Sequence, residues 1–343
     1  NPIIWSILIT SLSTSTIITM ASHHWMLAWL GLELNTLSIL PIIMKPHHPR
    51  ATEATTKYFL IQTLAAALIL FSSTLNAWQT GLWTITHSAP TTTIITLAIL
   101  LKLGAAPVHL WYPEVLQGTT LNTALLISTW QKLAPLTLLY MMHTTPQNNL
   151  LLLTGLLSTL LGGWTGLNQT QTRKIMAYSS IAHMGWILIA LHTNPQLATL
   201  TLTIYMIMTT AMFSSLNTTT TKTISDLGTS WSTSPTMMTL TLLTLTSLGG
   251  LPPLTGFMPK LLILDKLTTT PLLPLATMLA LSTLPSLFFY IRMTYMTTLT
   301  TPPNTTNTEH KWRFKATPSP NKTLMTAPAL LLMPLTPTLC MAT

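Results

Sequence analysis

Apolar runs of about 20 residues recur along the whole chain, and they decide what it can fold into. A run of this length forms a helix that crosses a hydrocarbon core of ~30 Å. Charged residues make up 6% of the 343 residues, against roughly 25% in ordinary soluble domains. So few charges cannot cover the surface of a soluble fold of this length. We therefore predict an all-α polytopic membrane protein.

The apolar pattern predicts about eleven transmembrane helices in a single membrane domain over residues 1–343. They are expected at 2–20, 24–44, 56–77, 91–111, 120–142, 148–168, 174–192, 196–219, 235–265, 272–297 and 322–342. The longest polar connection, 298–321, is expected to be a surface loop rather than a site. The first residues contain no basic or Arg-rich leader, so the first run is expected to be a retained span.

Basic residues are unequally distributed between alternate connections, which predicts the orientation of the chain. One set of connections holds ten of them and the other set holds only Lys266. The ten are Lys45, Arg50, Lys57, Arg173, Lys174, Lys222, Lys311, Arg313, Lys315 and Lys322. The richer side is expected to face the interior compartment together with the N-terminus. The net charge of +9 therefore does not indicate a nucleic-acid partner, because the distribution of the basic residues is explained by the orientation of the chain in the membrane.

Four ionisable residues lie inside predicted helices, where a charge costs about 2.5–3.5 kcal/mol to insert. They are Glu33, Lys102, Lys132 and Lys260. Lys102 lies about 17 Å into its span at 1.5 Å per residue, close to mid-membrane, and Lys132 is equally deep in the next span. Buried charges of this kind indicate movement of charge or protons across the membrane.

Two structural interpretations compete with transport. A lysine near a helix end can snorkel to the interface, which suits Lys57 and Lys174 better than the deep lysines. Glu33 paired with Lys102 or Lys132 would instead fix helix packing. Pairing and function are compatible, because an ion pair that can be made and broken acts as a proton switch.

Helix breakers stand beside two of the lysines. Gly104–Pro107 follows Lys102, and Gly249–Pro253 precedes Lys260. Proline in a helix interior removes a backbone hydrogen bond. Freed backbone at membrane depth is tolerated where it is buried in protein or lines a hydrated cavity. Two discontinuous helices are therefore expected, as in the ion sites of transporters, although either break alone also fits an ordinary proline kink.

His183 lies in the middle of a predicted span, and its titration range suits a relay between lysines. A hydrogen-bonded structural histidine is the alternative. Cys340 is the only cysteine, which excludes internal disulfides, a cysteine-ligated iron–sulfur cluster and a zinc site built on cysteines. No nucleotide-binding or nucleophile motif is present. We expect no cofactor and no metal in this chain.

Three motifs around these residues resemble one family. They are Trp29–Asn35, Leu101–Trp111 and Gly250–Phe257. They resemble the antiporter-like membrane subunits of respiratory complex I, and the resemblance covers essentially the full length. Members of this family usually have fourteen spans in two inverted five-helix repeats. The resemblance implies the same antiporter-like fold here, without the first three helices.

The resemblance also implies a proton channel within a redox-driven pump of the mitochondrial inner membrane. It assigns Glu33 as the partner of Lys102, Lys132 as a connecting lysine, and Lys260 as the far end of a charged axis. The FMN, iron–sulfur and ubiquinone chemistry of NADH:ubiquinone reductase would belong to partner subunits. The chain would work only with other membrane-arm subunits in the lipid bilayer, with its N-terminus in the matrix and its C-terminus in the intermembrane space.

Two other hypotheses remain open. A stand-alone cation/proton antiporter would use similar buried lysines, and it would be active in liposomes without NADH or partners. A passive scaffold would use the charges only to pack helices, and it would keep coupled pumping after Lys102→Met.

Overall fold

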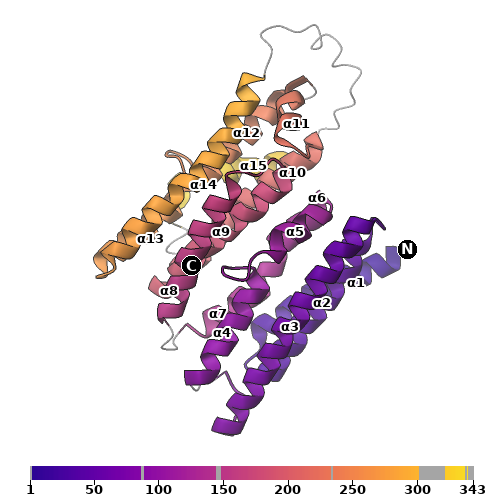
Figure 1. Ribbon diagram of the computed structural model, residues 1–343, viewed down its shortest axis with the longest axis vertical. Helices are drawn as coiled ribbons and strands as arrows, with labels where there is room; N and C mark the ends of the chain where they lie inside the picture. The colour runs from indigo at the N-terminus through magenta and orange to yellow at the C-terminus, as the bar shows by residue number, and fades with distance from the viewer. Residues whose placement is uncertain are drawn as a thin grey trace. The chain divides into compact units, whose positions relative to one another are not determined.

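The computed structural model describes residues 2–85, 89–143, 148–232, 235–300, 321–336 and 338 (Figure 1). The described chain is helical, and its bridges are the isolated pairs His24–Thr84 and Gln171–Thr223. The all-α prediction is therefore confirmed. Within the described residues, six helices are long and apolar enough to cross a membrane, by length and composition. The count of eleven spans stays a prediction.

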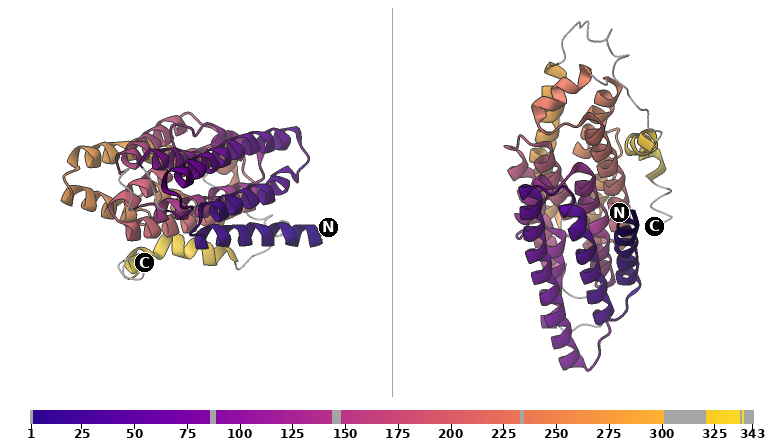
Figure 2. Two further views of the ribbon diagram at one scale, coloured as in Figure 1. Left: turned by 90° about the horizontal axis from the view of Figure 1, so that it is seen from below. Right: turned by 90° about the vertical axis from the view of Figure 1, so that its right-hand side faces the viewer.

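The chain divides into two compact units, Asn1–Ser158 and Thr159–Thr343. The first unit holds α1 (Pro2–Ala21), α2 (Trp25–Met44), α3 (Pro49–Thr80), α4 (Ala89–Leu103), α5 (Trp111–Gly118), α6 (Leu121–Ser128), the 3₁₀ turn η1 (Trp130–Lys132) and α7 (Leu133–Met141). Within it, α1, α2 and α3 run side by side, and α3 also packs against α4 and α5 (Figures 1 and 2).

The second unit begins within α8 (Asn148–Gly166). It continues through α9 (Thr172–Thr193), α10 (Pro195–Thr219), α11 (Ile224–Thr229), η2 (Ser230–Ser232), α12 (Pro235–Gly249), α13 (Phe257–Thr269), α14 (Leu273–Leu299), α15 (Asn321–Leu331) and η5 (Met333–Leu335). The expected last span, 322–342, is helical only to Leu331 before a 3₁₀ turn, and its final residues lie outside the described chain. Nearly all of the expected loop 298–321 also lies outside it.

The third helix is longer than predicted. It begins at Pro49 rather than at residue 56, because the His48 side chain accepts the Arg50 N–H and Pro49 occupies the first helical turn. It ends at Gly81, whose φ of 73° closes the helix in the left-handed conformation. Arg50 and Lys57 therefore lie in α3, and placing them in a connection was wrong. The same correction applies to Arg173 and Lys174, which lie in α9, and to Lys322, which lies in α15.

The first expected interruption lies at the end of α4. The Gly104 N–H donates to the Leu101 carbonyl at 3.2 Å, and the Ala105 N–H donates to the Leu100 carbonyl at 3.1 Å. Gly104 has a φ of 70°, which suits glycine. This pair of hydrogen bonds is a Schellman motif, and it ends the helix immediately after Lys102.

The second expected interruption, at the end of α12, has the same local structure. Gly250 has a φ of 81°, and its N–H donates to the Ser247 carbonyl at 3.0 Å. The Leu251 N–H donates to the Thr246 carbonyl at 3.3 Å. Both breaks therefore follow from local sequence, since each has a glycine at the position that must be left-handed and a proline soon after.

A third interruption was not predicted. The expected continuous span 120–142 contains the 3₁₀ turn η1 between α6 and α7. Pro135 has no N–H to donate to the carbonyl four residues earlier, and its ring crowds that carbonyl. Lys132 therefore lies where a helix is interrupted. Lys102 lies in a similar position, at the end of α4.

The short helix α11 outside the candidate spans begins with a capping box. The Thr223 side chain accepts the Asp226 N–H, and Asp226 Oδ2 accepts the Thr223 N–H at 2.9 Å and the Lys222 N–H at 3.1 Å. The Thr223 backbone hydrogen bond is the main cause that lowers the pKa of Asp226 below its usual value.

We expect acid to weaken this helix start. A lowered pKa contributes stability that is present above the unfolded-state pKa and is lost as the pH falls through the folded one. Hydrogen-exchange protection of the Thr223 amide should therefore decline below about pH 4, near the ordinary Asp pKa. Asp226→Asn should show reduced protection already at neutral pH. Equal protection in the two proteins across this range would contradict the assignment.

Candidate functional site

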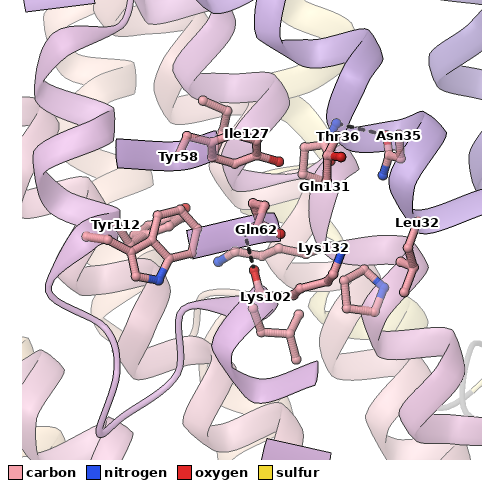
Figure 3. A pocket seen from close by; sticks show the side chains of 13 residues that line it. Leu32, Asn35, Thr36, Tyr58, Gln62, Lys102, Tyr112, Ile127, Gln131 and Lys132 are labelled. Carbon is pink, nitrogen blue, oxygen red and sulfur yellow. Dashed lines mark hydrogen bonds between the residues drawn. The ribbon is translucent and has the colours of Figure 1, made fainter. Parts of the chain in front are cut away.

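Lys102 and Lys132 meet at one buried cavity in the first unit (Figure 3). The cavity has a volume of about 20 Å³, which is enough for at least one water molecule. Lys102 is 6% exposed and Lys132 is 3% exposed. The polar residues that share the lining are Asn35, Thr36, Tyr58, Gln62, Tyr112 and Gln131. Two lysines that the sequence placed on separate helices thus face the same space.

Lys102 lies in the last turn of α4. A cation is favoured there, because the last carbonyls of a helix carry partial negative charge. Gln62 Nε2 of α3 donates to the Lys102 backbone carbonyl at 3.4 Å, which ties the broken end to the neighbouring helix. Lys102 Nζ has no hydrogen-bond partner within the described residues. Water in the cavity is the partner that such a buried group requires.

Lys132 is the last residue of η1. Its Nζ lies 5.1 Å from the centroid of the Tyr112 ring. The preceding residue fixes the turn, because Gln131 Nε2 donates to Asn35 Oδ1 of α2 at 3.1 Å. The backbone that carries Lys132 is therefore held by a side-chain hydrogen bond to a different helix.

Glu33 is half-buried on α2 and does not line the cavity. In the described part of the chain it forms no ion pair within 4.0 Å, so the direct pair with Lys102 or Lys132 is not formed. Its Oε2 is buried without a hydrogen-bond partner.

Lys260 and His183 line a second cavity, within the second unit. This cavity also has a volume of about 20 Å³. Lys260 Nζ donates to the Gly249 carbonyl at 2.9 Å, so the ammonium group caps the broken end of α12. The rings of His183 and Tyr205 are 5.5 Å apart. The second break, the third lysine and the histidine of the predicted relay thus belong to one place.

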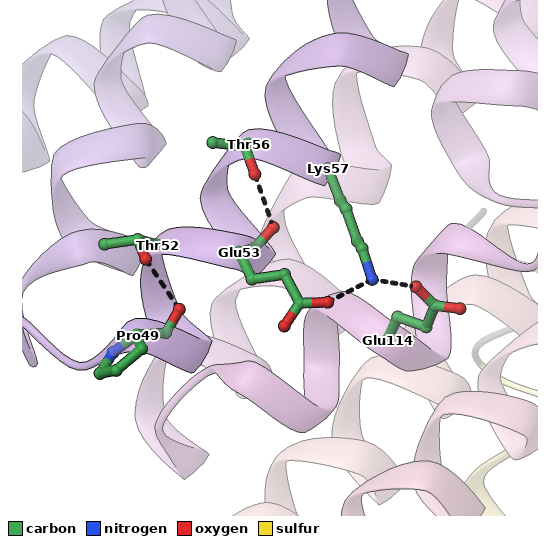
Figure 4. Close-up of polar contacts among 6 residues, drawn as sticks. All are labelled: Pro49, Thr52, Glu53, Thr56, Lys57 and Glu114. Atoms are coloured by element: carbon green, nitrogen blue, oxygen red, sulfur yellow. Dashed lines mark hydrogen bonds and ion pairs between the residues drawn. The ribbon is translucent and has the colours of Figure 1, made fainter.

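An exposed group of charges attaches α5 to α3 (Figure 4). Lys57 Nζ lies 2.6 Å from Glu53 Oε1 and 2.6 Å from Glu114 Oε2. The interpretation of Lys57 as a snorkelling lysine missed these two partners. Glu114 belongs to α5, the short helix that follows the break after Lys102, so this contact helps to hold that helix in position.

Sequence reasoning missed the polar lining of the first cavity. Gln62 and Gln131 lie in apolar runs, where an amide side chain has to be satisfied by protein or water. The two glutamines could therefore have been identified from the sequence as candidate cavity residues. Tyr58 and Tyr112 could not, because aromatic residues are common in membrane helices. The described residues contain no group of three or more His, Cys, Asp or Glu side chains placed to hold a metal.

Comparison with known proteins identifies the family of this chain. The family model described as NADH:quinone oxidoreductase/Mrp antiporter matches residues 22–285, and that of the NADH dehydrogenase subunit 2 C-terminus matches 287–340. The chain belongs to this family. It is 54% identical to NADH-ubiquinone oxidoreductase chain 2 of Salmo salar, over 98% of this chain and 97% of the relative. The corresponding protein of Xenopus laevis is also 54% identical, over 97% and 96%.

Solved structures share the fold. A chain of respiratory complex I from Thermus thermophilus with bound aureothin has a TM-score of 0.83 and 25% identity, covering 96% of this chain and 77% of that one. A chain of the Mrp complex from Dietzia sp. DQ12-45-1b has a TM-score of 0.80 and 16% identity, covering 98% and 74%. The antiporter-like fold is therefore established for this member of the family.

Proposed function

We propose that this chain is a proton-translocating membrane subunit of respiratory complex I in the mitochondrial inner membrane. The observation that carries the proposal is the meeting of Lys102 and Lys132 at one buried, water-sized cavity between helix breaks. Two ammonium groups facing one poorly hydrated space repel each other, so the cavity favours one shared proton over two. Water bridging the two amines would provide the path for its transfer.

The charged axis is proposed to run from Glu33 through Lys102 and Lys132 to Lys260, with His183 as a relay beside Lys260. The missing ion pair at Glu33 suits this role, because its carboxylate is free to attract a proton on Lys102 without holding it. Moving one charge through the membrane potential involves about 2.3 kcal/mol per 100 mV. Transfer of the proton from one lysine amine to the other involves a free-energy change of similar size.

The chain itself performs no redox chemistry in this proposal. It forms part of NADH:ubiquinone reductase, whose FMN, iron–sulfur clusters and ubiquinone belong to other subunits, and it works only with its membrane-arm partners in the lipid bilayer. Eleven helices in one membrane domain correspond to the family pattern without its first three helices, with the two predicted discontinuities after α4 and α12 and the further interruption at η1. The N-terminus and the basic connections face the matrix, and the C-terminus faces the intermembrane space.

A second candidate is a stand-alone cation/proton antiporter, because the matching family model also covers the Mrp antiporter. A native gel of mildly solubilised membranes, stained for NADH dehydrogenase activity and probed for this chain, separates the two. We expect the chain to migrate with a large NADH-oxidising assembly and to show no cation-driven proton movement when reconstituted alone in liposomes. Migration as a small species that exchanges cations for protons would favour the antiporter.

A further inference from the structure

Tyr112 is placed to act on Lys132. The Lys132 ammonium lies 5.1 Å from the centroid of the Tyr112 ring, within the ~6 Å at which a cation is attracted by an aromatic face. Tyr112 is 2% exposed and Lys132 is 3% exposed. The attraction is stronger in such a site than at a surface, because water does not screen it. Figure 3 shows both side chains at the cavity.

The short helix α5 holds this ring rigidly. The Trp111 ring lies against Tyr112, with centroids 5.6 Å apart, and against Tyr58 of α3, at 5.8 Å. Gly104 lets the chain close tightly here, since a Cβ at that position would lie 3.3 Å from the Tyr112 Cβ. The Lys57–Glu114 ion pair attaches the same first turn of α5 to α3. The ring is therefore fixed before any proton arrives.

We infer that Tyr112 is a positioning residue of the proton path, whose ring face holds the protonated side chain of Lys132 at the cavity. This inference rests on the proposed function. The ring favours the ammonium form of Lys132 and offsets the repulsion from Lys102 across the same space. It thereby makes Lys132 the resting place of the shared proton, while Lys102, whose Nζ contacts no protein acceptor in the described chain, is the position from which the proton is passed on.

The titratable groups that face Lys132 across the cavity are few. They are Lys102 of α4, Tyr58 of α3 and Tyr112 of α5. The other polar lining residues from α2, α3 and η1 are uncharged. Helix α1, which packs against α7, contains no ionisable side chain. A change in the pH dependence of pumping caused by a Tyr112 substitution therefore reflects mainly the protonation of Lys102 and Lys132.

The test compares Tyr112→Leu with Tyr112→Phe in the assembled complex in sealed membrane vesicles. NADH-driven proton pumping and NADH oxidation are measured together as a function of pH. Tyr112→Phe keeps the ring face, and its profile should match the parent. Tyr112→Leu removes the face, and the alkaline limit of pumping should move about one unit to lower pH, equivalent to about 1.4 kcal/mol. Equal profiles for the two variants would overturn the inference.

Two further variants keep the result interpretable. If Tyr112→Leu does not assemble, Tyr112→Met fills the same space without an aromatic face and should show the same shift. A one-unit shift in Tyr112→Phe would also overturn the inference, because the hydroxyl rather than the ring would then be responsible. Lys132→Met separates the two proposals: pumping that survives it contradicts the proposed function, whereas pumping lost in Lys132→Met but unchanged in Tyr112→Leu contradicts the role of Tyr112 alone.

Discussion

Lys102→Met should abolish coupled proton pumping by this chain while leaving the complex assembled. Methionine is close to lysine in length and fits the apolar surroundings, so the packing of α4 is kept and only the protonatable amine is lost. A positioned proton-transfer group contributes about 10²–10⁴-fold to the rate of its step. We therefore expect NADH-driven acidification in vesicles to fall by about tenfold or more, with NADH oxidation slowed because the two processes are coupled.

Lys266→Met is the matched control, because Lys266 is exposed on α13 and lines neither cavity. It should pump as the parent does. The amount of assembled complex on a native gel has to be equal in the two variants before pumping is compared. Normal pumping in assembled Lys102→Met would support the passive scaffold. If variants of Lys102, Lys132 and Lys260 all pumped and turned over normally, the charged axis would have to be abandoned.

Gly256→Ala should disrupt the packing of α13 against α12 at the second break. Gly256 precedes α13, and a Cβ there would collide with the backbone carbonyl oxygen of Ser247 in α12 and lie 2.9 Å from its carbon. A backbone carbonyl cannot rotate away as a flexible side chain can. Overpacking typically costs about 1–3 kcal/mol, and we expect the upper end here. Because Lys260 lies in the first turn of α13, the substitution also moves Lys260 relative to the Gly249 carbonyl that it caps.

Gly249→Ala provides the comparison, since a Cβ at that position would meet only Tyr290, whose Cδ2 lies at 3.7 Å and Cβ at 3.9 Å. That variant should assemble to the parental level and unfold at the parental temperature. Gly256→Ala should give less assembled complex and a lower unfolding temperature, measured by native gel and by thermal denaturation of the purified assembly. Parental stability in Gly256→Ala would show that α12 and α13 do not approach each other this closely.

Local chemistry made much of the fold predictable. Apolar runs and scarce charges specify membrane helices, because only internally hydrogen-bonded backbone is tolerated in hydrocarbon. The breaks after Leu103 and Gly249 were predictable for a similar reason. Glycine and proline act on their own few residues, so Gly104 and Gly250 end their helices whatever surrounds them. The break at η1 was harder to foresee, because Pro135 lies three residues beyond the turn that it disturbs.

The sequence by itself determined that this chain is helical, that it belongs in a membrane, and that Glu33, Lys102, Lys132 and Lys260 lie in apolar stretches. Only the tertiary structure decided which of them share a space. Lys102 and Lys132 face one cavity, and Lys260 joins His183 at another. Glu33 stands apart from the lysines and forms no direct ion pair among the residues that the structure describes. The difference is physical: burial and helix formation depend on a residue and its near neighbours, whereas meeting at a cavity depends on how separate helices pack. Tyr112 shows this most directly, because only the packing of α5 against α3 brings its ring to Lys132.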